Sequence, residues 1–126
     1  MSRTFAAIAA LTFIFASSAA SAQMLKTAGT PKGKTFVDAK GMTLYTFDKD
    51  AGGKSTCNGP CAENWPPLAA TDDAKPTADM TIVVRDDGKK MWAYKGKPLY
   101  TFKQDAAPGE TKGDGFLNGA WHMAKP

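Results

Sequence analysis

The hydrophobic and polar positions of this chain follow the period of β-strands rather than that of helices. Residues 44–47 and residues 99–102 both read Leu-Tyr-Thr-Phe. Because side chains alternate between the two faces of a strand, Leu and Thr lie on one face while Tyr and Phe lie on the other. We expect the aromatic face of each strand to be turned toward the core.

Tight-turn signals separate the strands. Lys-Gly occurs at 40–41 and at 95–96, and Asp-Asp-Gly occurs at 86–88 after a β-branched run. These signals predict one hairpin early in the chain and a three-stranded meander later. The expected strands are 35–39, 42–47, 81–85, 89–94 and 97–102. A single helical turn is expected at 60–64, because proline is favoured at the first helical position.

The two Leu-Tyr-Thr-Phe segments belong to a duplication. Residues 41–56 and 96–111 are identical at eight of sixteen positions when they are aligned at an offset of 55. The alignment extends backward without a gap, so that 34–39 corresponds to 89–94. Self-similarity of this length indicates a duplicated structural unit.

The duplication predicts the architecture. Neither pair of strands can bury its aromatic face alone, so we expect the two faces to pack against each other. The predicted fold class is all-β, with two pseudo-symmetric hairpin repeats forming one small barrel or sandwich. The expected single domain spans 35–126, and its repeats span 35–68 and 81–126.

The N-terminus has the pattern of a secretory signal peptide at residues 1–22. Arg3 precedes an apolar run at 5–16, which is too short to span a bilayer, and Ala20-Ser21-Ala22 has the small-x-small form of a cleavage site. We expect cleavage after Ala22, followed by a flexible lead-in at 23–34. No cysteine stands at the cleavage site to carry a lipid. The predicted location is periplasmic or secreted, without an integral membrane segment after cleavage.

Charge changes this picture little. Without Arg3, the chain retains 15 basic and 12 acidic residues. The lysines are scattered rather than gathered in the basic stripe of a nucleic-acid-binding protein. No nucleic-acid partner is therefore expected.

Two cysteines occur in the chain, Cys57 and Cys61. In an oxidising compartment this pair predicts a disulfide that closes a short loop and contributes about 2 kcal/mol. Trp65 and Trp121 follow at nearly the same distance in their copies and close the two repeats. Copper binding or thiol-redox chemistry at Cys57 and Cys61, completed by His122 and Met123, is the alternative reading, although the spacing is not diagnostic.

Two aspartates are also repeated. Asp50 and Asp105 each lie five residues after a repeated tyrosine. We expect them to accept the hydrogen bond of a buried tyrosine hydroxyl or to cap the loop backbone, rather than to bind a ligand.

The sequence contains none of the common catalytic motifs. G-x-S-x-G, H-E-x-x-H and a phosphate-binding glycine loop are all missing from the 126 residues, and one histidine offers no evident base for a nucleophile. Neither catalysis nor a cofactor is expected. A different use of the aromatic residues is a carbohydrate- or peptide-binding groove, lined by Tyr45, Tyr100, Trp65, Trp92 and Trp121.

The motifs together resemble a known family. The residues that carry the resemblance are Leu44 to Asp50, the C-x-x-x-C loop, Trp65-Pro66-Pro67-Leu68, Asp87-Gly88, Gly96 to Tyr100, Asp105 and Trp121. From Thr35 to Pro126 the chain is similar to the bacterial secreted-repeat family of predicted lipoproteins with a Y-x-(F/W/Y)-x-x-D motif. The resemblance implies an exported two-repeat domain whose molecular function is not established, with Tyr45, Phe47, Asp50, Tyr100, Phe102 and Asp105 as motif residues.

The functional expectation is an exported, non-catalytic β-repeat domain with a binding or structural role at the bacterial cell envelope. Its partner is expected to be an envelope component or a small ligand. The periplasmic copper or thiol-redox protein remains the alternative.

Overall fold

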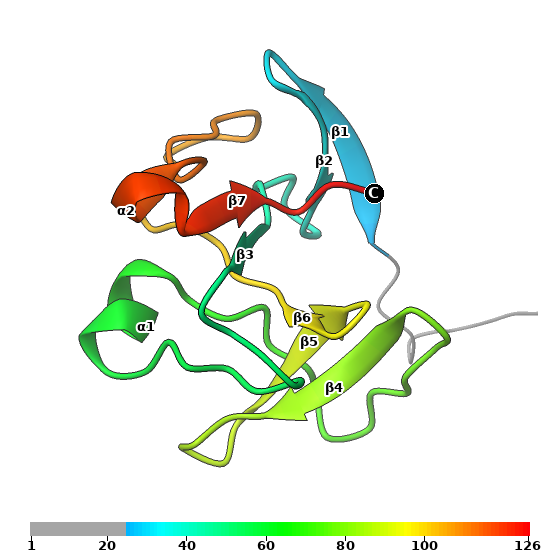
Figure 1. Cartoon of the computed structure of the whole chain (residues 1–126). Helices are drawn as coiled ribbons and strands as arrows, with labels where there is room; N and C mark the ends of the chain where they lie inside the picture. The colour runs from blue at the N-terminus through cyan, green and yellow to red at the C-terminus, as the bar shows by residue number, and fades with distance from the viewer. Residues whose placement is uncertain (1–24) are drawn as a thin grey trace, which may run out of the picture.

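The computed structural model describes residues 25–126, which form an all-β domain with two short helices (Figure 1). This agrees with the predicted fold class. The elements in chain order are β1 (Lys26–Thr30), β2 (Gly33–Val37), β3 (Tyr45–Phe47), α1 (Pro60–Asn64), β4 (Met80–Val84), β5 (Lys90–Tyr94), β6 (Lys97–Pro98), α2 (Phe116–Gly119) and β7 (Trp121–Met123).

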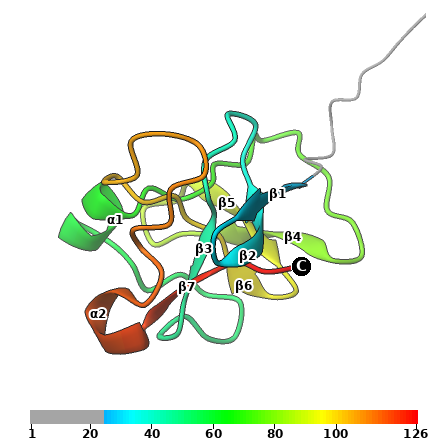
Figure 2. The same ribbon diagram turned by 90° about the horizontal axis from the view of Figure 1, so that it is seen from above.

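The described strands form three small antiparallel sheets rather than one closed barrel. β1 pairs with β2, β3 pairs with β7, and β4, β5 and β6 form a meander. Figure 1 shows β3 and β7 between the other two sheets, and in Figure 2, seen from above, β1 and β2 lie over the β4–β6 meander. None of the described helices is long and apolar enough to cross a membrane.

The meander confirms the turn prediction of the later half. Gly88 adopts a φ of 84° in the β4–β5 turn, and Lys95 and Gly96 adopt φ values of 49° and 83° between β5 and β6. Two consecutive positive φ values are those of a type I′ turn, whose twist suits a tight hairpin. The predicted helical turn is also present as α1, with Pro60 at its start.

The predicted early hairpin is present but shorter than expected. An isolated bridge between Val37 and Thr43 and two backbone bonds connect the expected strands: Leu44 N donates to Phe36 O at 3.0 Å, and Asp38 N donates to Met42 O at 2.9 Å. β3 instead pairs with β7, and Tyr45 lies opposite Met123. The pairing ends after one bridge because the next residues of the chain, β3, pair with β7 in the other half.

The flexible lead-in expected at 23–34 contains regular structure. β1 runs antiparallel to β2, with Thr27 opposite Phe36, so strands begin at Lys26 rather than near Thr35. β1 is largely exposed and holds its place through the backbone ladder. A strand of this kind needs no alternating apolar side chains, and the sequence pattern therefore gave no signal.

The two halves are related by a pseudo-twofold axis. Tyr45 N donates to Tyr100 O at 2.7 Å, and Tyr100 N donates to Tyr45 O at 3.0 Å. Away from this central pair the bonds recur in matched positions: Leu68 N to Leu99 O is 2.9 Å, and Ala124 N to Leu44 O is 2.8 Å. The predicted internal symmetry is thus confirmed in the backbone.

The gapless alignment of 34–39 with 89–94 is wrong by one residue. Phe36 N donates to Ala124 O at 2.8 Å, and the matching donor in the other half is Trp92 N, 2.9 Å from Leu68 O. Phe36 thus corresponds to Trp92, 56 residues later, because the second half has a longer β4–β5 turn and a shorter β5–β6 turn. Turn lengths changed after duplication while the buried positions kept their register.

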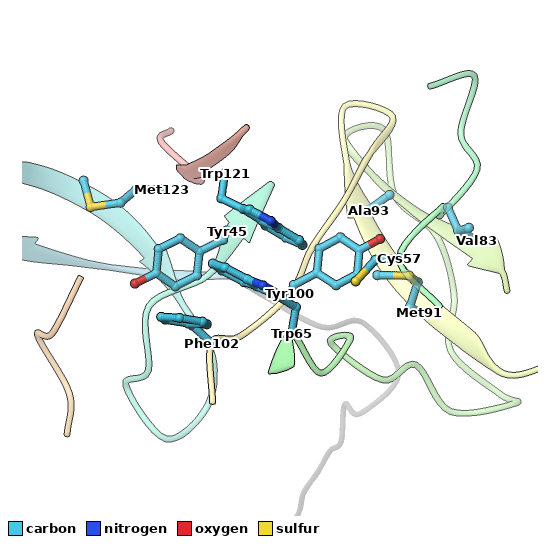
Figure 3. Close-up of a cluster of buried hydrophobic side chains, with 10 residues drawn as sticks. All are labelled: Tyr45, Cys57, Trp65, Val83, Met91, Ala93, Tyr100, Phe102, Trp121 and Met123. Atoms are coloured by element: carbon cyan, nitrogen blue, oxygen red, sulfur yellow. The ribbon is translucent and has the colours of Figure 1, made fainter. Parts of the chain in front are cut away.

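Both faces of the central strands are buried. The aromatic face contributes to one cluster, drawn in Figure 3, which contains Tyr45, Cys57, Trp65, Val83, Met91, Ala93, Tyr100, Phe102, Trp121 and Met123. Leu44 and Leu99, fully buried, belong to a second cluster with Phe36, Met80, Trp92 and Ala124. The prediction that the aromatic face points to the core is confirmed, and the opposite face has a core of its own.

Candidate functional site

The centre of the first cluster is a stack of four aromatic rings, which we call the aromatic stack. Trp65 and Trp121 lie face to face, with centroids 3.7 Å apart and planes 2° from parallel. Phe102 covers the outer face of Trp65 at 4.0 Å, and Phe47 covers Trp121 at 4.2 Å. Each tryptophan also meets a tyrosine edge to face, Tyr45 on Trp65 and Tyr100 on Trp121. Phe47 and Phe102 thus occupy symmetry-related environments.

The tyrosine hydroxyls cross from one repeat to the other. Tyr45 donates to Asp105 Oδ2 at 2.5 Å, and Tyr100 donates to Asp50 Oδ2 at 2.6 Å. Each aspartate was expected to serve either a tyrosine or the loop backbone. It serves both, because Asp50 Oδ1 accepts from Thr56 N at 2.7 Å and Asp105 Oδ1 accepts from Lys112 N at 2.9 Å.

Burial governs the protonation of these groups. It raises the pKa of Tyr45 and of Tyr100 well above the usual value, and the hydrogen bond to the aspartate adds to the effect. Burial also raises the pKa of Asp105, against the bonds from Tyr45 and Lys112 that favour its ionised form. The six motif residues therefore hold the two repeats together from inside the protein.

The predicted aromatic groove is wrong. Trp65, Trp92 and Trp121 are at most 3% exposed, and Tyr45 and Tyr100 are fully buried. These rings leave no surface on which a sugar or a peptide could stack. The sequence could not separate a buried core from a binding groove, because both are rich in tyrosine and tryptophan.

The two cysteines form the predicted disulfide, with Sγ atoms 2.01 Å apart. The loop that it closes is fixed by a residue that sequence reasoning missed, Arg85, whose side chain is only 3% exposed. Its Nη1 donates to Ser55 Oγ and its Nη2 to Cys57 O, both at 2.7 Å. Ser55 Oγ lies 2.6 Å from the Tyr100 hydroxyl, so the disulfide loop connects to the crossed tyrosine.

The copper or thiol-redox alternative needs four residues in one site, and the structure brings together only Cys57 and Cys61. Figure 3 places Met123 and Cys57 at opposite ends of the first cluster. His122 is exposed on the other face of β7, where its Nε2 lies 2.9 Å from Asp48 Oδ2. Within residues 25–126, no three side chains of His, Cys, Asp or Glu are grouped as metal ligands would be.

A surface cleft of about 620 Å³ lies beside β7, and we call it the β7 cleft. It is bounded by β3, the β5–β6 turn, the loop before α2 and the C-terminal residues. Its lining consists of Thr46, Asp48, Tyr94, Lys95, Lys97, Asp114, His122, Met123, Ala124, Lys125 and Pro126. Sequence reasoning could not find this cleft, because its residues come from four separated segments without a shared motif.

The fold and the crossed motif define a class of protein, a tandem-repeat β domain whose interior is built from one motif used twice. The model of a family described as a secreted repeat of unknown function matches residues 26–69 and 81–125. The chain belongs to this family, as the sequence resemblance indicated. The first matched segment begins at Lys26, where β1 begins. Comparisons with curated proteins and with solved structures found no match.

Proposed function

We propose that this chain is an exported, non-catalytic domain that binds a component of the bacterial cell envelope through the β7 cleft. The description of its family as secreted supports export. The observation that carries the binding role is the cleft itself, which forms where β3, the β5–β6 turn and β7 meet. Its volume of about 620 Å³ falls within the range of ligand-binding pockets.

Two features favour a non-catalytic role. The hydroxyls of Tyr45 and Tyr100 are buried, and burial raises their pKa, which makes them weaker acids than a free tyrosine. The aspartates that they contact already accept backbone bonds from Thr56 and Lys112. The repeated polar groups thus have partners within the fold and offer no free acid or base to a substrate.

Elements of both repeats line the cleft, but two of its charged residues are not repeated in the other half. Lys97 corresponds to Met42 in the first half, and Asp48 corresponds to Lys103 in the second half. Residues that only maintain the fold would be expected in both halves, whereas Lys97 and Asp48 each occur in one half only. Such asymmetry supports a binding role confined to the β7 cleft.

The test begins with location. We expect the expressed chain to be released by osmotic shock with the mass of residues 23–126, and an unprocessed cytoplasmic chain would contradict export.

Binding is measured by co-sedimentation of the purified mature protein with envelope fragments. We expect Lys97→Gln with Lys125→Gln to reduce the sedimented fraction. The charge-matched control, Lys40→Gln with Lys103→Gln, changes exposed lysines that do not line the cleft and should sediment like the parent. Equal sedimentation of both variants would refute binding through the cleft.

A further inference from the structure

We infer that the β7 cleft binds an anionic glycan, a sugar chain that carries carboxylate or phosphate groups. The inference rests on the proposed binding function and names its ligand class. Lys95, Lys97 and Lys125 would hold the acidic groups, and Tyr94 would present its ring to a sugar face. These residues line one cleft although they come from two segments of the chain.

The charge of the cleft is the first argument. Its two acidic side chains are engaged: Asp48 lies 2.9 Å from His122 Nε2, and Asp114 lies 3.5 Å from Lys32 Nζ. Asp114 also accepts from Met123 N at 3.1 Å.

The basic side chains of the cleft are free by comparison. Among residues 25–126, Lys95, Lys97 and Lys125 have no carboxylate within ion-pair distance. All three are exposed. Three unpaired ammonium groups on one concave surface attract an anion, and the walls of the cleft strengthen that field.

The second argument is the aromatic ring in the cleft. Tyr94 is half-buried, and its ring meets Phe36 edge to face, with centroids 4.6 Å apart. Phe36 belongs to the second core cluster, so the Tyr94 ring is held in place by packing against the core. Lys95 Nζ lies over the Tyr94 ring, 5.3 Å from its centroid, so that a cation and the aromatic ring are in contact. A rigid ring with an adjacent ammonium matches an acidic sugar, which has an apolar face and an anionic substituent.

A glycan fits these observations better than a nucleic acid. Lys95, Lys97 and Lys125 gather in one cleft, whereas the other lysines are scattered singly or in pairs along the chain, without a basic run that could follow a phosphate backbone. One ring beside three cations also provides no series of platforms for successive bases.

The experiment measures binding of defined polymers to the mature protein by titration calorimetry. An oligogalacturonate supplies carboxylates on sugar, and a teichoic acid supplies phosphates in a polymer that carries sugar. Inorganic polyphosphate supplies charge without sugar, a maltooligosaccharide supplies sugar without charge, and a single-stranded DNA oligonucleotide represents nucleic acid. We expect at least one of the two anionic glycans to bind, and the three comparison polymers to bind about tenfold or more weakly.

The variants assign the contacts. Lys97→Gln with Lys125→Gln should weaken glycan binding about tenfold and reduce the dependence on salt by about two ions. Lys40→Gln with Lys103→Gln is the charge-matched control and should leave the Kd unchanged. Lys95 is kept in every variant, because its Nζ lies over the Tyr94 ring and its removal would change the surroundings of the ring as well as the charge.

The ring is tested separately. Tyr94→Leu should weaken glycan binding, and Tyr94→Phe should retain it, since the phenyl ring still covers the site. Melting temperatures of all variants establish that each is folded.

Several results would overturn the inference. One is that neither anionic glycan binds, and another is that polyphosphate or DNA binds as tightly as the glycans. A third is that Tyr94→Leu binds like the parent. Loss of envelope sedimentation in the double lysine variant, together with no glycan binding, would leave the proposed function standing and remove only the ligand class.

Discussion

The crossed hydrogen bonds predict an energetic coupling between the two repeats that a double-mutant cycle can measure. Tyr45→Phe removes the hydroxyl that lies 2.5 Å from Asp105 Oδ2. Asp105 is only 6% exposed and keeps its bond from Lys112 N, but its second oxygen loses its partner. Leaving a buried acceptor unpaired costs about 1–3 kcal/mol, so we expect Tyr45→Phe to destabilise the domain by that amount.

The cycle isolates the pair. Asp105→Ala also removes the cap of the Lys112 amide, but this loss occurs with and without the tyrosine hydroxyl and cancels in the cycle. The remaining coupling between Tyr45 and Asp105 should be about 1.5–3 kcal/mol, because the acceptor is a charged group. Urea unfolding followed by tryptophan fluorescence gives the four free energies of unfolding.

The control cycle combines Tyr45→Phe with Asp50→Ala. These two residues belong to the same repeat, and the aspartate serves Tyr100 instead. We expect a coupling below about 0.5 kcal/mol for this pair. A strong coupling within the repeat and a weak one across repeats would refute the crossed arrangement.

Three further predictions concern stability. The folded state keeps both repeat tyrosines protonated, whereas the unfolded chain ionises them near their usual pKa. The free energy of unfolding should therefore fall above about pH 10, by up to about 2.7 kcal/mol per pH unit. Replacing one of the two tyrosines by phenylalanine should halve this loss. Melting temperatures measured from pH 8 to pH 11 in about half-unit steps check this, and a flat profile would contradict it. Gly113→Ala places a Cβ 2.6 Å from the Trp65 ring and should cost about 1–3 kcal/mol in urea unfolding, whereas Gly29→Ala has no atom within 4 Å and should be nearly neutral. Replacing Cys57 and Cys61 by serine should lower the free energy of unfolding by about 2 kcal/mol without loss of the fold, and a chain without native circular dichroism would show that the loop matters more than its length implies.

Local chemistry accounts for what the sequence predicted correctly. The meander follows from β-branched residues and glycine turns, α1 from Pro60, and the disulfide from two cysteines four residues apart. The duplication also predicted a shared aromatic interior, and the aromatic stack is that interior. Each of these features is carried by residue types that favour one local conformation.

The remaining features depend on pairing between distant segments. Nothing in residues 45–50 indicates that Tyr45 selects the aspartate 60 positions away over the one five positions away. β1 has no apolar pattern because it is exposed, and Arg85 looks like a solvated residue after a strand although its side chain is buried. The β7 cleft arises only when four segments meet.

The contact between Trp65 and Trp121 has a spectroscopic consequence. One indole comes from each half, and the two rings lie parallel with centroids 3.7 Å apart. Transitions of two chromophores so close together couple, and this exciton interaction changes the ultraviolet absorption of the pair in a way that neither half can produce alone. The protein thus carries an intrinsic reporter of whether its halves are docked, readable without any added label.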